Sequence, residues 1–122
     1  MQTPGFPPTL EQLERFLNDH WGEAVHTQEP SITASQSAGI RFFIPVNTTS
    51  GVVTITLPPV EGNTGRLYCV KKTSADGNNV VVDGYGSETI DGAANITWST
   101  QYRSYTIICD GAAWHIIGIY TP

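Results

Sequence analysis

The sequence is poor in charged residues, in cysteine and in long hydrophobic runs. Only 14% of its 122 residues are charged, and 11 acidic against 6 basic residues give a net charge of −5. An acidic chain is repelled by nucleic-acid phosphates and by anionic lipids, so we expect neither nucleic acid nor membrane as a partner. No apolar run approaches the roughly 20 residues that a membrane-spanning helix needs.

Residues with metal-binding or catalytic chemistry are few and scattered. The two cysteines, Cys69 and Cys109, belong to no redox or zinc motif, and nothing indicates an oxidising compartment. We expect buried thiols, although the sequence alone does not decide whether they pair. His20, His26 and His115 lack the spacing of a metal site. No nucleophile elbow or phosphate-binding loop is present, so we expect a non-enzymatic protein without cofactor or metal.

The composition favours an all-β fold. With 12 glycines, 8 prolines and many threonines and serines, the chain has frequent turn signals between short alternating segments. Asp110-Gly111 predicts a hairpin, and a second antiparallel pair is expected between residues 66–71 and 79–83. The apolar windows 80–82 and 116–117 are expected in covered strands. We therefore predict an antiparallel sandwich or jelly roll of about eight strands, at residues 40–46, 52–57, 66–71, 79–83, 89–90, 95–99, 102–109 and 113–120.

The N-terminal part has a different pattern. Residues 1–8 are proline-rich and predict an extended arm. A short amphipathic helix is expected next, because apolar side chains recur there at helical spacing. Such a helix is marginal alone, so its stripe must pack on its own domain, on sister subunits or on another surface. The predicted organisation is arm and helix at 1–27, connector at 28–39 and β-domain at 40–122. The candidate anchoring or trimer-interface residues are Leu10, Leu13, Phe16, Leu17 and Trp21.

Two motifs resemble a known family. GSETIDG at residues 86–92 and CDGAAWHII at residues 109–117 are similar to a small β-module of tailed-phage virion proteins, found in capsid decoration proteins, head fibres and tail fibres. The resemblance covers roughly residues 54–117. It implies a β-rich, usually trimeric, non-enzymatic component of the virion, made in the host cytoplasm. Its implied partners are copies of itself and the major capsid protein or another virion protein.

Three functions remain open at this point. A chain this short has no long fibre shaft, so we expect a trimeric capsid decoration protein or short head fibre. The first alternative is a tail-fibre tip that binds a host cell-surface glycan through exposed loops. The second is a free carbohydrate-binding module. The candidate loop contacts are Asp76, Asn78, Asn79 and Tyr85, the last because a tyrosine between two turn glycines is expected to be exposed.

Two further residue sets have both a functional and a structural interpretation. Asp83, Glu88 and Asp91 cluster in sequence, but Asp-Gly pairs are primarily turn formers and the spacing is not that of a calcium loop. Large aromatics on strands stack on sugars in some modules, but are more often buried in the core or in a subunit interface. We favour the structural interpretation for both. The aromatic set is Tyr85, Trp98, Tyr102, Tyr105, Trp114 and Tyr120.

Overall fold

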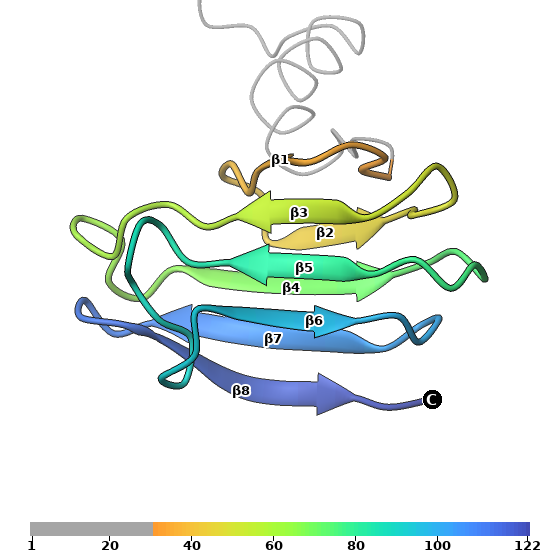
Figure 1. Cartoon of the computed structure of the whole chain (residues 1–122). Coiled ribbons are helices and arrows are strands. Elements are labelled where there is room, and N and C mark those ends of the chain that lie inside the picture. Colours follow the sequence, from red (N-terminus) through yellow and green to blue (C-terminus); the bar gives the residue numbers. More distant parts are fainter. Residues whose placement is uncertain (1–30) are drawn as a thin grey trace, which may run out of the picture. The chain divides into compact units, whose positions relative to one another are not determined.

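Eight strands in two stacked four-stranded sheets form the part of the chain that the computed structural model describes, residues 31–122 (Figure 1). Sheet A has the order β2-β4-β7-β8, and sheet B has the order β1-β3-β5-β6. The prediction of an all-β, sandwich-like fold is confirmed. The expected arm and helix, with their candidate anchoring residues, lie outside the described residues. The strands are β1 (Gln36–Ser37), β2 (Phe43–Val46), β3 (Val53–Thr56), β4 (Leu67–Lys72), β5 (Val80–Asp83), β6 (Asn95–Trp98), β7 (Ser104–Cys109) and β8 (Trp114–Tyr120).

The sheets are mixed, and the expectation of purely antiparallel pairing is wrong. Strands β1–β3, β3–β5 and β2–β4 pair in parallel, while β4–β7, β5–β6 and β7–β8 are antiparallel. The reason is that the first five strands alternate between the two sheets, so that β1, β2 and β3 each pair with the next strand but one. Only β6 and β8 directly follow their antiparallel partners, β5 and β7, in the chain.

The expected hairpin between residues 66–71 and 79–83 does not form. These segments are β4 and β5, which lie in different sheets. A polar, glycine-containing turn supports a crossing between stacked sheets about 10 Å apart as well as a hairpin. The other predicted hairpin is confirmed, because β7 and β8 pair across Asp110-Gly111 with Cys109 opposite Trp114.

The core lies between the sheets and follows the alternation of the strands. In β3 and β5 the inward residues are fully buried and the outward ones are half-buried. The Tyr68 and Trp114 rings, whose centroids are 5.6 Å apart, are completely buried. Successive inward side chains from both sheets thus form one hydrophobic cluster.

The segment preceding β2 contributes more side chains to the core of the sandwich than expected. Ile32 and Ala38, assigned to the connector, are buried in the core, and Ile32 pairs with Val46. In contrast Ile40 and Phe42, in the first half of the strand predicted at residues 40–46, are 89% and 52% exposed. The regular strand begins only at Phe43, where the chain pairs with β4.

The two motif segments contact each other. Trp114 N–H donates to the Thr89 carbonyl at 3.0 Å, and Asp91 N–H donates to the Trp114 carbonyl at 3.0 Å. The Asp91 carboxylate also accepts the Ile116 N–H. The strand expected at residues 89–90 is reduced to isolated bridges of Ile90 with Ala93 and Trp114, because the chain turns back directly after it. The motifs are therefore a structural junction between the β5–β6 connection and β8.

The described residues contain no disulfide and no membrane-spanning helix. Cys69 and Cys109 are free thiols, the first half-buried and the second buried. Within residues 31–122 no helix has the length and hydropathy needed to cross a bilayer.

Candidate interaction surface

The loop around Asp76 is used for internal contacts. Lys72 is completely buried, and its ammonium donates to Thr48 Oγ1 at 2.9 Å, to the Asn78 carbonyl at 2.9 Å and to Asp76 Oδ1 at 3.2 Å. Asp76 also accepts from the Thr48 hydroxyl and from the Asn78 N–H. These hydrogen bonds hold the pKa of Asp76 well below its usual value of 3.8, with that from Ser74 the largest cause. Asp76 and Asn78, predicted as exposed contacts, are partners of the buried lysine, and Asn79 is half-buried.

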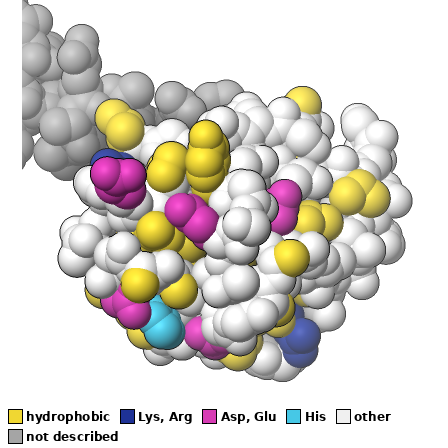
Figure 2. All heavy atoms as spheres, turned by 60° about the vertical axis from the view of Figure 1, so that its left-hand side comes forward, with side chains coloured by type: hydrophobic (Ala, Val, Ile, Leu, Met, Phe, Trp, Pro, Cys, Tyr) yellow, Lys and Arg dark blue, Asp and Glu magenta, His cyan; other side chains and the backbone are white. Residues whose placement is uncertain are grey.

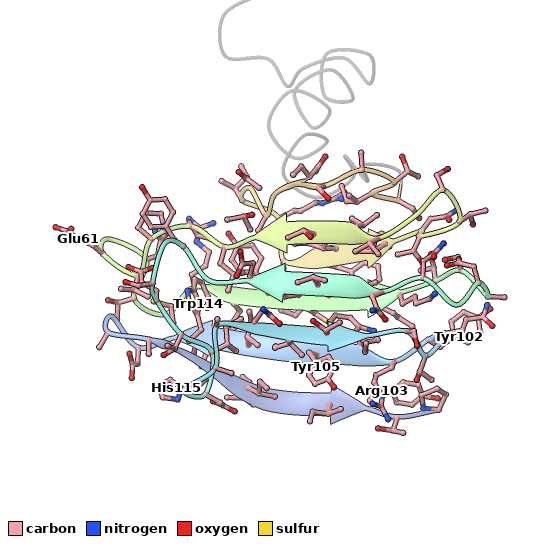
Figure 3. The ribbon with its side chains drawn as sticks, in the orientation of Figure 1. Glu61, Tyr102, Arg103, Tyr105, Trp114 and His115 are labelled. Atoms are coloured by element: carbon pink, nitrogen blue, oxygen red, sulfur yellow. The ribbon has the colours of Figure 1, made fainter. Side chains whose placement is uncertain are left out.

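The aromatic set divides between core and surface. Trp98 and Trp114 are buried, and the Trp98 ring lies 4.7 Å from that of half-buried Tyr105. Tyr85, Tyr102 and Tyr120 are each about half exposed. Tyr102 and Trp114 lie toward opposite ends of the sandwich (Figure 3). The structure therefore forms no single platform from the six residues.

The three acids at residues 83–91 have separate structural roles. Glu88 accepts the Val60 N–H, and Asp91 accepts the Ile116 N–H. Asp83 ends β5 and pairs with Asn95. Among the described residues, no group of three histidine, cysteine or acidic side chains is arranged to hold a metal ion.

Asp110 anchors the β7–β8 turn beside His115. One carboxylate oxygen accepts the N–H groups of Ala112 and Ala113 at 2.8 Å each, and the other lies 2.6 Å from His115 Nε2. The two backbone hydrogen bonds, followed by the imidazole, lower the pKa of Asp110 from 3.8 to about 2. His115 also lies 3.7 Å from Asp91, next to the motif junction.

This turn predicts an acid-dependent contribution to stability. Because the folded-state pKa of Asp110 lies below the unfolded value, its contribution is complete above about pH 5 and is lost as the pH falls toward 2. An Asp110→Asn variant is expected to melt at a lower temperature than wild type at about pH 7, with the difference disappearing near pH 2. Melting curves across this range test the prediction. A difference that stayed constant with pH would contradict it.

The two sheets have outer faces of different chemistry. On sheet B the outward side chains of the three longer strands are polar, with one exception, Val81. They include Thr54 and Thr56 of β3, and Thr97 and Asn95 of β6, which lie opposite Val81 and Asp83. Hydroxyl, amide and carboxylate groups thus dominate the outside of sheet B, which is the expected pattern for a sheet facing water.

Sheet A has an apolar outer face. Strand alternation and register identify the outward residues of this sheet, which together are called the sheet A face. Phe43 and Leu67 are each 39% exposed, and Ile117, the extra residue of a bulge, is 58% exposed. None of its residues is acidic, in a chain with net charge −5. The sheet A face comprises Phe43, Leu67, Cys69, Lys71, Ser104, Thr106, Ile108, His115, Ile117 and Tyr120.

The edge strand β8 extends this surface. It has seven residues, contains no proline, and has β7 as its only neighbouring strand in the sheet, while Trp114 at its start is bridged to Ile90. Besides Ile117, the exposed side chains of Ile119 and Tyr120 lie on it. The expectation that window 116–117 lies in a covered strand is therefore wrong. Long apolar edges invite association, so β8 and the sheet A face form the candidate interaction surface.

One cation lies at the corner of this surface. The ammonium of Lys71 lies 5.6 Å from the ring centroid of Tyr102 and 5.4 Å from that of Tyr120. Such contacts with ring faces attract a cation without a carboxylate partner. They also keep the long lysine side chain against the protein.

Sequence reasoning missed this surface for a physical reason. Alternation shows that one side of a strand is buried, and apolar residues on the other side of β4 and β7 look like ordinary surface exceptions. They form a patch only once the register places Leu67 beside Ile108 and Ile108 beside His115.

A scan against protein-family models finds no match, and a search of the curated proteins finds none.

Proposed function

We propose that this protein is a non-enzymatic structural component of a tailed-phage particle that associates with copies of itself through the sheet A face. The observation that carries the proposal is the contrast between the polar outside of sheet B and the largely apolar outside of sheet A, whose strand residues include no carboxylate. An exposed apolar patch of this kind marks an interaction site in a soluble protein. A second copy suits it, because the residues of the face include no acidic side chain, and the two carboxylates at its edge, Asp91 and Asp110, lie against His115.

The proposed assembly is a homotrimer, and the proposed role is a capsid decoration protein or short head fibre. The motif resemblance supports both. In this assignment residues 1–27 attach the trimer to the major capsid protein or another virion protein, and the β-sandwich is displayed. Cryo-electron microscopy of the parent particle with the protein labelled distinguishes capsid three-fold positions from the tail tip, the location of the alternative tail-fibre role.

The assembly predicts a specific sensitivity to charge. A Leu67→Lys/Ile117→Lys variant of the full chain is expected to be monomeric where wild type is trimeric, because each interface would have to bury unpaired ammonium groups. Light scattering coupled to size-exclusion chromatography measures the mass of each species. Thr97→Lys on sheet B is the matched control and is expected to remain trimeric. A monomeric wild-type protein, or a charged variant that still assembles fully, would contradict the proposed interface.

A further inference from the structure

A pocket lies at the end of the sandwich where β3 ends, away from Tyr102. Its volume is about 460 Å³, within the usual range for small-ligand sites. Its walls come from separate parts of the chain: the end of β3 with Pro58-Pro59, the loop at Asn63, the start of β4 at Arg66 and the turn at Tyr85. Figure 2 turns this end forward and shows apolar side chains, with acidic ones among them, near one of the few basic side chains in view.

One wall is aromatic and held in place. Tyr85 is 52% exposed, on a turn closed by the hydrogen bond from Glu88 N–H to the Tyr85 carbonyl at 2.9 Å. The preceding Gly84 is packed against the Glu88 carbonyl, which fixes the direction of the turn. With Pro58 and Pro59, the ring forms an apolar surface. A tyrosine ring in this position can stack on the apolar face of a pyranose.

Arg66 contributes a positive charge to the lining of the pocket. Its guanidinium interacts with the Tyr68 hydroxyl and opposes the rise that burial causes in the pKa of Tyr68, and that hydroxyl donates to the Gly39 carbonyl. No aspartate or glutamate is among the residues that line the pocket, and within residues 31–122 Arg66 forms no salt bridge. The fork of a guanidinium matches the two oxygens of a carboxylate. In an acidic chain, an arginine at a pocket that forms no salt bridge with any described carboxylate favours an anionic ligand.

Polar groups complete the lining. Asn63 Nδ2 donates to the Pro59 carbonyl at 2.7 Å, which orients the amide and leaves its oxygen as an acceptor for a ligand hydroxyl. The Thr56 side chain adds a hydroxyl to the lining. The pocket thus combines an apolar stacking wall, neutral hydrogen-bonding groups and one cation.

We propose that this pocket binds a hexuronic acid residue of an acidic polysaccharide, with the sugar ring on Tyr85 and its carboxylate on Arg66. A pyranose has both an apolar face and hydroxyl groups, and the carboxylate distinguishes it from neutral sugars. The site is separate from the sheet A face and does not depend on the proposed assembly. It also differs from the Asp76 loop, whose carboxylate is used internally.

The test is calorimetric titration of the full chain with oligosaccharides containing glucuronic, galacturonic or mannuronic acid, each beside its carboxyl-reduced counterpart. At least one acidic oligosaccharide is expected to bind about tenfold or more tightly than its neutral form, the effect of one charge-assisted hydrogen-bond pair. Arg66→Gln and Tyr85→Ala are each expected to weaken binding about tenfold or more. Lys71→Gln and Tyr102→Ala are matched controls, because they alter a cation and an exposed tyrosine outside the pocket.

Several results would overturn the proposal. The proposal fails if no acidic oligosaccharide binds, if the neutral forms bind equally well, or if only the two control variants lose binding. Amide chemical shifts of the wild-type protein provide a readout that needs no substitution, with changes expected at Asn63 and Tyr85 and not at Tyr102. Tyr85→Ala is expected to assemble as wild type does, so failure of this site and failure of the proposed assembly are observed separately.

Discussion

A Lys72→Met variant is expected to lose about 3 to 5 kcal/mol of the free energy of unfolding, because it removes the cation from a buried polar network. Methionine retains much of the apolar stem, so the loss reports mainly on the ammonium group. Lys72 is completely buried, and its ammonium satisfies the Thr48 hydroxyl, the Asn78 carbonyl and Asp76. Without it, the Asn78 carbonyl and the Asp76 carboxylate lose their charged donor and keep only neutral ones, while remaining partly buried.

The neighbouring lysine provides the control for this prediction. Lys71 points to the outside of sheet A and contacts the rings of Tyr102 and Tyr120. Lys71→Met is expected to cost less than about 1 kcal/mol, the usual value of an exposed cation–ring contact. Urea denaturation of both variants measures the two losses. Equal losses would show that the network around Lys72 is not a principal source of stability.

A Gly84→Ala variant is expected to be destabilised by about 3 kcal/mol, at the upper end of the usual cost of overpacking. A Cβ atom at this position would lie 2.2 Å from the Glu88 carbonyl oxygen, well inside contact distance. That oxygen belongs to the backbone and cannot move aside by a rotamer change. Gly84 is also buried and donates to the Ala94 carbonyl, so the whole turn would have to shift.

Two other glycines separate crowding from backbone strain. Gly86 has open space around it but a φ of 57°, so Gly86→Ala is expected to cost about 1 kcal/mol for the left-handed conformation. Gly77 has open space and no left-handed φ, so Gly77→Ala is expected to change stability by less than about 0.5 kcal/mol. Thermal and urea denaturation of the three variants give the order. A loss for Gly84→Ala no larger than that for Gly86→Ala would contradict the close packing of this turn.

The positions of most strands were predictable because the signals are local. Alternating apolar residues and the turn at Asp110-Gly111 depend only on residues near in sequence, and they located most of the strands and the β7–β8 hairpin. The exposure of Tyr85 followed in the same way from its two flanking glycines. The segment at residues 89–90 was overestimated, since two residues before a turn make a bridge and not a strand.

Sheet membership was not predictable in this way. The pattern of β4 and β5 indicates that each buries one side, but it does not state which neighbour it pairs with or in which direction. The connection through Asp76 and Gly77 has the composition of a hairpin turn, yet it crosses between sheets around the ammonium of Lys72. The mixed topology therefore appears only when distant segments are placed together.

The sequence by itself determined an all-β domain with buried alternating side chains and without recognisable catalytic motifs, because these properties follow from composition and local periodicity. Only the tertiary structure decided the candidate interaction surface and the pocket. Leu67 and Ile108 become one apolar face through strand register, and Arg66 reaches the pocket wall of Tyr85 through folding of separate loops. Both are long-range relations, set by the packing of two sheets around one core.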